Sequence, residues 1–252
     1  MDLALTGAPP SPYTSCMEYT IREPARGIPP PEQRPLLAVD VVIFTVRETT
    51  LQVLLVQRPE PPFQGVWALP GGFVQLQEPL DEAARRELAE HTGAQNVYLE
   101  QLYTFGAPNR DPRARVVSVV YFALVSPDHL DLRPGNGLVS TCWHPMYNLP
   151  PTAFDHAAIL EYALQRLRYK LEYTAVAFQL LPEEFTLSEL QDVYAVILNE
   201  PSLDKRNFRK KVLKNGIVTP TNRFRETGGR PARLYRFSKS QPFEGRAPRL
   251  FP

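Results

Sequence analysis

One segment of the chain places acidic residues, an arginine and glycines at fixed intervals. Gly72 is followed after five residues by Glu78, and after seven more by the stretch Arg86-Glu-Leu-Ala-Glu-His-Thr-Gly-Ala94. In a helix, positions 87, 90 and 91 lie at i, i+3 and i+4 and therefore share one face. Three carboxylates on such a face suit Mg²⁺, which prefers oxygen ligands and bridges phosphate oxygens. A metal held there would polarise a pyrophosphate and activate a water for hydrolysis.

This spacing resembles the signature of the Nudix family, G-x5-E-x7-R-E-U-x-E-E-x-G-U, in which U is an aliphatic residue. The preceding Trp67-Ala-Leu-Pro-Gly-Gly72 is similar to the strand and turn that lead into that signature, and the resemblance covers about Leu36–Leu149. It implies an α+β Nudix fold, which is a mixed sheet with helices.

The chain departs from the signature at one position, because His91 replaces the second glutamate of the Glu-Glu pair. In the family, the residues that match Glu87 and His91 are direct metal ligands, and the one that matches Glu90 supports the site. Imidazole suits zinc, copper or nickel better than Mg²⁺, and one negative charge is lost. We therefore expect Glu87 and Glu90 to hold Mg²⁺ only weakly, and Glu90 is the catalytic candidate if the protein is active. His91 is either an altered ligand or a solvated residue at the end of a helix.

Strands and helices are expected on both sides of this motif. The motif itself predicts a helix over Glu78–Thr92, with Gly93 as its C-cap. Four leucines spaced by four, three and four residues after Pro150-Pro151 predict a helix of about 18 residues, whose stripe packs on its own domain or on a second copy. The β-rich runs that surround the motif predict strands, and they are Leu36–Val46, Leu51–Gln57, Val97–Phe105 and Val116–Val125.

The loop between the last two strands combines aromatic residues with three arginines. The planar guanidinium group of arginine suits phosphate oxygens, and aromatic rings suit a base. The candidate ligand-binding residues are Arg86, Arg110, Arg113 and Arg115. Two alternatives remain open. The loop is an exposed polar hairpin with surface arginines, or Arg85 and Arg86 instead serve the ligand and the internal carboxylates, two roles that the sequence does not assign between them.

The last third of the chain has a different charge from the rest. Residues 186–252 hold 14 Lys and Arg against 6 Asp and Glu, whereas the whole chain has a net charge of only +1. Thr186 and Glu189 form a capping box, and the helix that they begin ends near Asn199–Pro201. A second helix is expected over Asp204–Lys214, with Phe208 and Val212 facing inward. Strands at Ile217–Thr219 and Arg233–Phe237 complete a winged helix-turn-helix.

A cationic helix of this kind fits the major groove of DNA, where Arg and Lys reach guanine and Asn reaches adenine. We place Arg223, Arg225, Gly228, Gly229 and Arg230 at the tip of the hairpin. A winged helix can also serve for protein contacts alone, and RNA binding lacks an aromatic stacking motif. The candidate DNA-binding residues are Lys205, Arg206, Asn207, Arg209, Lys210, Lys214, Arg223, Arg225 and Arg230.

A Nudix domain followed by a basic winged helix resembles the Nudix-related transcriptional regulators, bacterial repressors of NAD-metabolism genes with relatives in sugar catabolism. The likeness extends over about Leu36–Phe237, and the stretches that carry it are Tyr103–Arg115, Phe154–Ala157, Thr186–Tyr194, Asp204–Arg209 and Gly229–Phe237. It implies ADP-ribose or a related effector, a homodimer and a palindromic operator. We therefore expect a ligand-responsive regulator that needs no metal to bind DNA. The alternative is a Mg²⁺-dependent pyrophosphohydrolase that acts on ADP-ribose or a similar nucleoside diphosphate sugar.

Composition excludes several other classes. The 252 residues are 43% hydrophobic and 22% charged, so wholesale disorder is excluded. The longest apolar run covers 116–125, about half a membrane-spanning helix. No secretory signal is visible and there are only two cysteines, which favours a reduced, cytoplasmic protein without membrane contact. The expected segments are a Pro-rich irregular arm (1–35), a Nudix domain (36–150), a connecting helix (151–181), a winged helix (182–240) and an irregular tail (241–252).

Overall fold

The computed structural model describes residues 27, 29–95, 97–129, 140–226 and 231–238. The first unit of the chain ends at Arg34 and contains a short 3-10 helix, η1 (Pro31–Gln33). Most of the predicted N-terminal arm lies outside the described residues. All other elements belong to the second unit, which begins at Pro35. Every helix in the described residues is too short or too polar to span a bilayer.

A mixed seven-stranded sheet forms the first part of the second unit. Its main strand order is β3-β2-β1-β6-β5, while β4 pairs with β1 and β7 with β2. The pair β1–β6 is parallel and the other pairs are antiparallel. The predicted strands and fold class are therefore confirmed. The strands are β1 (Leu36–Arg47), β2 (Thr50–Gln57), β3 (Trp67–Ala68), β4 (Gly71–Phe73), β5 (Tyr98–Phe105), β6 (Val116–Leu124) and β7 (Thr141–Pro145).

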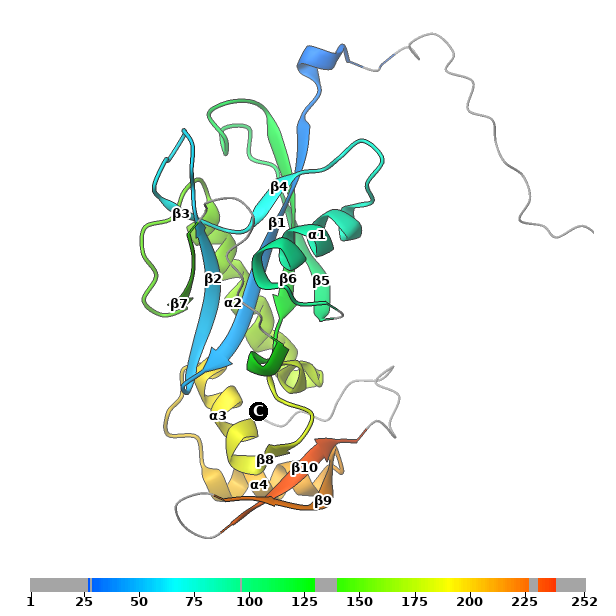
Figure 1. Ribbon diagram of the computed structural model, residues 1–252, viewed down its shortest axis with the longest axis vertical. Coiled ribbons are helices and arrows are strands. Elements are labelled where there is room, and N and C mark those ends of the chain that lie inside the picture. Colours follow the sequence, from blue (N-terminus) through cyan, green and yellow to red (C-terminus); the bar gives the residue numbers. More distant parts are fainter. Residues whose placement is uncertain (1–26, 28, 96, 130–139, 227–230, 239–252) are drawn as a thin grey trace, which may run out of the picture. The chain divides into compact units, whose positions relative to one another are not determined.

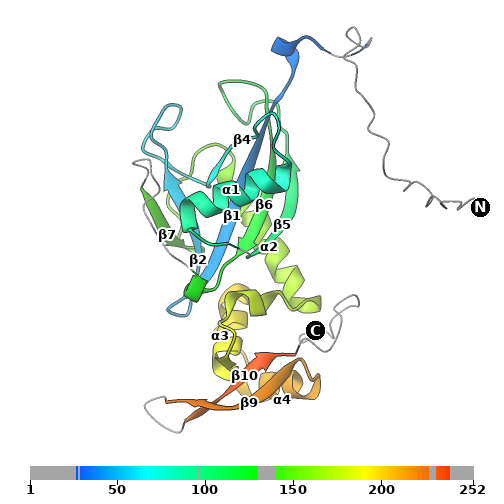
Figure 2. The same cartoon turned by 45° about the vertical axis from the view of Figure 1, so that its right-hand side comes forward.

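Two helices cover opposite faces of this sheet (Figures 1 and 2). Side chains of a strand alternate between its faces, so Val41 and Ile43 of β1 pack with α1 (Leu80–Thr92), whereas Val42 and Phe44 pack with α2 (His156–Tyr173). The predicted leucine stripe of α2 is buried in this second layer. Self-packing is thus confirmed for the stripe, and the alternative that it faces a second copy is wrong.

A short 3-10 helix, η2 (Pro127–His129), lies between β6 and β7 in the Nudix part of the chain. The winged helix follows α2. Its elements are η3 (Val176–Leu180), β8 (Phe185–Thr186), α3 (Leu187–Leu198), α4 (Lys205–Lys214), β9 (Val218–Arg225) and β10 (Ala232–Phe237). Strands β8, β10 and β9 form a three-stranded sheet. The capping box of Thr186 and Glu189 is confirmed, and the Asp204 carboxylate caps α4 by accepting from the amides of Arg206 and Asn207.

The hairpin differs from the prediction in the length of its first strand. Because the residues after Thr219 pair with β10, β9 continues to Arg225. Arg223 and Arg225 therefore lie within a strand and not at the hairpin tip, and that prediction is wrong. Gly228, Gly229 and Arg230 lie outside the described residues.

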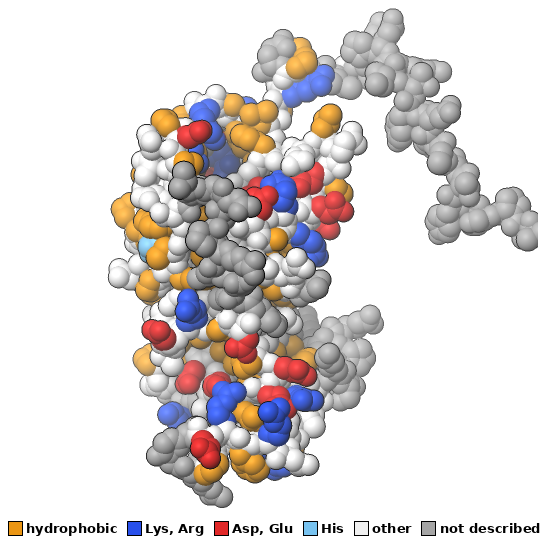
Figure 3. All heavy atoms as spheres, in the orientation of Figure 1, with side chains coloured by type: hydrophobic (Ala, Val, Ile, Leu, Met, Phe, Trp, Pro, Cys, Tyr) orange, Lys and Arg blue, Asp and Glu red, His pale blue; other side chains and the backbone are white. Residues whose placement is uncertain are grey.

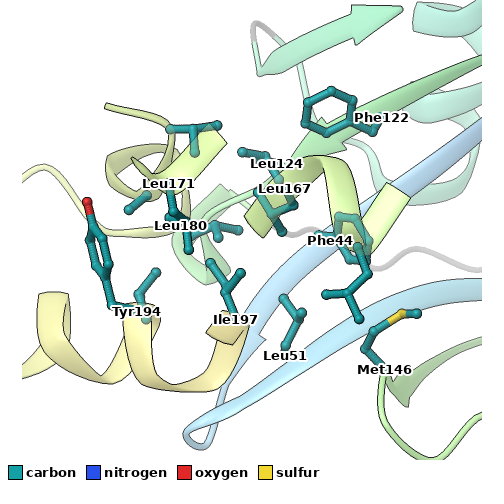
Figure 4. Packing of buried hydrophobic residues seen from close by; sticks show 14 of the residues in the cluster. Phe44, Leu51, Phe122, Leu124, Met146, Leu167, Leu171, Leu180, Tyr194 and Ile197 are labelled. Atoms are coloured by element: carbon teal, nitrogen blue, oxygen red, sulfur yellow. The ribbon is translucent and has the colours of Figure 1, made fainter. Parts of the chain in front are cut away.

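One apolar core joins the Nudix sheet to the winged helix. The same cluster of buried side chains includes Phe44 of β1, Leu167 of α2, Ile197 of α3 and Phe208 of α4. Figure 4 shows Ile197 in the packed layer that also contains Leu51 and Leu167. Because α2 contributes to both sides of this cluster, the two halves of the unit share their core.

This shared core predicts that unfolding is cooperative across both halves. Leu167→Ala removes a fully buried side chain and should lower the free energy of unfolding by about 2–5 kcal/mol. Leu76→Ala is the control, since Leu76 is 96% exposed. Urea unfolding followed by tryptophan fluorescence and by circular dichroism should give one coincident transition. Two separate transitions, or no loss of stability in Leu167→Ala, would contradict the shared core.

Candidate functional site

Helix α1 carries the motif, and its start is set by a proline. Pro79 is the N-cap, and a residue before proline is disfavoured in the helical region, so Glu78 precedes the helix and does not begin it as predicted. At the other end Gly93 has the left-handed conformation, with φ of 67°. The predicted C-cap is therefore confirmed.

Arg86 holds the carboxylates of the motif together. It donates to both oxygens of Glu78, at 2.8 and 3.1 Å, and to Oε1 of Glu87 at 2.7 Å. Glu90 lies 3.7 Å away. The hydrogen bond from Arg86 lowers the pKa of Glu78. In turn, the carboxylates of Glu78 and Glu87 raise the pKa of Arg86. The guanidinium of Arg86, a candidate ligand-binding group, is thus committed to internal carboxylates.

Glu87 is buried under the turn that precedes the helix. A Cβ atom at position 72 would collide with its Oε1, so a side chain there would displace the Glu87 carboxylate. Burial raises the pKa of Glu87, an effect that Arg86 opposes. On the other side, His91 Nε2 lies 3.9 Å from Glu87 Oε2. The His91 side chain is only 19% exposed, so the interpretation of His91 as a solvated residue is wrong.

The carboxylates do not converge as the three-carboxylate scheme requires. Glu90 is 57% exposed, whereas the side chains of Glu87 and His91 are largely buried. Among the described residues, no group of three His, Cys, Asp or Glu side chains is arranged to hold a metal ion. Since one carboxylate is missing and another is bound by Arg86, these residues do not fit a Mg²⁺ site of that type.

A cavity of about 350 Å³ opens beside His91. Its polar and aromatic lining comes from one end of the sheet, from the end of α1, from the loop between β5 and β6, and from the start of α2. In Figure 3, a recess in the upper part of the molecule contains basic side chains beside an acidic one. The charged and aromatic lining residues are Asp40, Arg58, Phe73, His91, Arg110, Asp111, Arg113, Phe154 and His156.

Two of the predicted ligand-binding arginines line this cavity. Arg110 forms two hydrogen bonds with Asp155, at 2.7 and 2.9 Å, and its side chain is only 6% exposed. Arg113 donates to both oxygens of Asp111. The loop is therefore not simply an exposed polar hairpin. Arg115 bonds the carbonyls of Ala107 and Val116 and does not line the cavity.

Sequence reasoning missed the most available cation of the cavity. Arg58 lies over the ring of Phe154, at 4.7 Å from the ring centre, and Arg113 lies 5.7 Å from the same centre. Arg58 donates to the carbonyl of Pro62 and has no carboxylate within ion-pair distance in the described part of the chain. Burial and the charge of Arg113 lower the pKa of Arg58. An anion bound beside Arg58 would oppose this lowering of its pKa.

His156 fixes the floor of the cavity. Its Nδ1 accepts a hydrogen bond of 2.9 Å from the amide of Leu69, so the neutral ring carries its proton on Nε2. That nitrogen lies 3.8 Å from Asp40, which in turn accepts a hydrogen bond from Ser118. Burial lowers the pKa of His156. The segment Phe154–Ala157 contributed to the resemblance, but the sequence assigned no role to its side chains.

Arginines beside an aromatic ring suit a ligand with phosphates and a planar base. A guanidinium binds phosphate oxygens through paired hydrogen bonds, and aromatic rings bind flat groups by stacking. The cavity therefore fits a nucleotide or nucleoside diphosphate better than a neutral metabolite.

The outer face of α4 forms a second candidate site. All five cations predicted to face outward are exposed, and none has an ion-pair partner within the described ranges. They are Lys205, Arg206, Arg209, Lys210 and Lys214. Asn207 is also exposed, and Arg209 donates to the hydroxyl of Ser188 at 3.0 Å. Phe208 and Val212 are buried, as predicted.

The cations of β9 are placed differently. Arg223 forms an ion pair of 2.8 Å with Glu184, and Arg225 pairs with Glu189, the residue of the capping box. The lower part of Figure 3 accordingly shows acidic and basic side chains intermixed. The described part of the wing is thus largely neutralised, in contrast to α4.

Comparison with known families defines the class of protein. Residues 35–165 match the NUDIX domain, and residues 177–237 match the NrtR DNA-binding winged helix domain. This is a Nudix domain joined to a winged helix. The chain is also 40% identical over 220 residues to the "ADPR responsive transcriptional repressor NtrR" of Acinetobacter baylyi, covering 86% of this chain and 87% of that one. The chain belongs to the NrtR family.

Two further relatives agree with this assignment. Shewanella oneidensis NrtR, crystallised with a 27mer DNA, has a TM-score of 0.72 and 40% identity, covering 80% of this chain and 93% of its own. The "ADP-ribose pyrophosphatase" of Methanocaldococcus jannaschii is 37% identical over 127 residues, which are 50% of this chain and 72% of that protein. The second likeness is therefore confined to about half of the chain.

The buried state of His156 predicts a pH dependence of stability. Its pKa in the folded protein is lowered, so below about pH 6.5, the usual histidine pKa, the unfolded chain binds more protons and stability falls as the pH falls. His156→Gln should lose less unfolding free energy than the wild type between about pH 7 and pH 5. Urea titrations at several pH values measure this difference, and an unchanged pH slope in the variant would contradict it.

Proposed function

We propose that this protein is a ligand-responsive transcriptional regulator, which senses ADP-ribose or a related nucleotide in the cavity and binds operator DNA through α4. The observation that carries the proposal is the presence of two unlike cationic sites on one core. One is a cavity beside Phe154, and the other is an exposed helix face. The names of the relatives support both halves, since one is an ADPR-responsive repressor and another was crystallised with DNA.

In this proposal the phosphates of the ligand bind beside Arg58 and Arg113. Arg113 is already paired with Asp111, and Arg110 with Asp155, so these two arginines shape the cavity while Arg58 supplies the uncompensated charge. Arg86 and Arg115, both candidates from the sequence, have structural partners and do not line the cavity. We therefore propose Arg58, and not Arg86 or Arg115, as the main residue that contacts the phosphates.

Replacing Arg58 tests the cavity. Arg58→Met keeps much of the side-chain volume and removes the charge, and a hydrogen bond to a charged group contributes about 1.5–3 kcal/mol. The affinity for ADP-ribose, measured by calorimetry, should therefore fall roughly tenfold or more. Arg85→Met is the matched control, because Arg85 is exposed on α1 and does not line the cavity. Equal affinities in all three proteins would place the ligand elsewhere.

Replacing the outer arginines of α4 tests the DNA interface. A good bidentate contact to a base contributes about 1–3 kcal/mol, so Arg206→Ala or Arg209→Ala should weaken binding at least several-fold at fixed salt. The DNA is a fragment that the wild-type protein selects from a random pool, and fluorescence anisotropy gives the affinity. Arg47→Ala, which removes an exposed cation of β1, should bind as the wild type does. If the α4 variants also bind normally, the interface lies on another surface.

Several parts of the proposal extend beyond these two sites. A homodimer would present two α4 helices to the two halves of a palindromic operator, whose centres lie about 34–36 Å apart per turn of DNA. A regulator acts where the DNA is, so we place the protein in the cytoplasm. The segment boundaries expected from the sequence remain part of the proposal, although α2 is packed on the Nudix sheet over much of its length.

A second candidate function is hydrolysis of the same ligand. It is favoured by the retained residues Glu78, Arg86, Glu87 and Glu90, and by the likeness to a protein named ADP-ribose pyrophosphatase. We propose that this activity is absent or feeble because His91 replaces a carboxylate. Glu87 and Glu90 would hold Mg²⁺ weakly, and Glu90 would be the catalytic residue if hydrolysis occurs. DNA binding requires no cofactor in this scheme.

The release of AMP from ADP-ribose with Mg²⁺ or Mn²⁺ tests this second function. The wild type should show little turnover, because poor positioning alone costs about 10²-fold in rate. His91→Glu should raise the activity, whereas His91→Gln, the matched neutral control, should not. Robust wild-type turnover that is lost in Glu87→Gln would instead establish a hydrolase.

A further inference from the structure

Helix α2 extends from the cavity to the winged helix. At its N-terminal end, Asp155 is the N-cap and binds Arg110, while His156 lines the cavity. Its 18 residues span about 27 Å at 1.5 Å per residue. Arg168, near the C-terminal end, reaches the winged helix. A single helix therefore contacts the cavity at one end and the winged helix at the other.

The contact at the far end involves two side chains, Tyr147 and Arg168, which we call the α3 clamp. Arg168 Nε donates to the carbonyl of Ile197 at 3.0 Å, and its Nη2 donates to the Tyr147 hydroxyl at 3.2 Å. That hydroxyl lies 2.7 Å from the carbonyl of Ile197 and 2.9 Å from that of Val196. Its one proton is shared between these two acceptors.

The clamp binds the end of α3 where a helix needs partners. The last carbonyls of a helix have no partner within it, and the partial negative charge at that end attracts cations. Asn199 and Glu200 donate to the carbonyl of Ala195, the preceding position. The clamp donates to the carbonyls of Val196 and Ile197, so a link to the Nudix side supplies hydrogen bonds to the end of α3.

Tyr147 attaches the clamp to the Nudix sheet as well. It follows β7, and the amide of its neighbour Met146 donates to the carbonyl of Leu51 in β2. The end of α3 is therefore fixed from two directions, by the sheet through Tyr147 and by α2 through Arg168.

From α3 the position of the DNA-binding helix is determined by direct contacts. Tyr194 of α3 packs against Phe208 of α4, with ring centres 5.3 Å apart. Gln191 donates to the carbonyl of Leu203, in the turn between the helices, at 2.9 Å. A rotation of α3 about its end would therefore move the cationic face of α4 with it.

We propose that the α3 clamp is the contact through which ligand occupancy of the cavity changes the direction of α4. This inference rests on the proposed function. A ligand at Arg58, Arg110 and His156 bears on the first turn of α2, and a displacement of α2 is delivered by Arg168 to the last turn of α3. Tyr147 and Arg168 are positioning residues, which touch neither ligand nor DNA.

The clamp side chains are at least partly exposed, which allows their role in transmission to be tested separately from a role in stability. Tyr147 is exposed and Arg168 is partly exposed, while the apolar core beside them includes Leu167 and Ile197. Changing the polar atoms of the clamp leaves that core in place. A variant should therefore fold, bind ligand and bind DNA, yet transmit less between the two sites.

The experiment measures the affinity of the full-length protein for its selected DNA fragment, with and without saturating ADP-ribose. In the wild type we expect the ligand to change this affinity by about 5–150-fold. Tyr147→Phe, which keeps the ring and loses only the hydroxyl, and Arg168→Gln should reduce that ratio at least about threefold. Calorimetry without DNA should give the wild-type affinity for ADP-ribose in both variants. Arg166→Gln, an exposed cation of the same helix, should respond as the wild type does.

The possible outcomes distinguish a failure of the proposed function from a failure of the clamp inference alone. A wild-type protein whose DNA affinity is indifferent to ADP-ribose would overturn the proposed function, and this inference with it. A normal wild-type response that persists unchanged in Tyr147→Phe and Arg168→Gln would overturn the clamp alone. Weaker ligand binding by Tyr147→Phe in the absence of DNA would also overturn it, because the hydroxyl would then serve the cavity directly.

Discussion

The packing of α2 against two partners is the constraint on which the rest of the structure depends. One side of this helix covers the Nudix sheet through Leu160, Leu164 and Leu167, and its last turns continue into the core of the winged helix. Apolar burial is the dominant favourable term in folding, so a helix that serves both halves joins their stabilities. The site at the start of α2 and the DNA-binding helix beyond its end are then connected through one continuous apolar core.

The contacts that hold the motif together are present although His91 replaces a glutamate of the signature. Arg86 binds Glu78 and Glu87, and Gly72 lets the Glu87 carboxylate lie under the turn. None of these contacts involves position 91, so histidine is accommodated there without disturbing the helix. His91 instead lines the cavity. Fold and cavity therefore do not depend on a carboxylate at position 91, which agrees with the proposed sensing role.

Local signals predicted much of the structure. The motif spacing, the left-handed Gly93, the Thr186–Glu189 capping box and the inward Phe208 and Val212 depend on neighbours in sequence, and they were all visible there. The cavity could not be predicted in the same way, since Arg58 and Phe154 meet only after strands and α2 assemble. The length of β9 was also not predicted, because its last residue, Arg225, is in the strand only through its pairing with Ala232 of β10. The sequence left open whether Arg86 serves a ligand or internal carboxylates, and the three-dimensional structure pairs it with Glu78 and Glu87.

In the proposed regulator, ligand in the cavity acts on the winged helix through α2 and the contacts that Arg168 and Tyr147 make with the end of α3. Amide hydrogen exchange on the full-length protein without DNA tests it most directly, because exchange reports local opening along the whole chain. On addition of ADP-ribose, we expect changed exchange at the cavity and also along α2 and in the last turn of α3, around Val196 and Ile197. Changes confined to the cavity segments, with α3 and α4 exchanging as before, would contradict it.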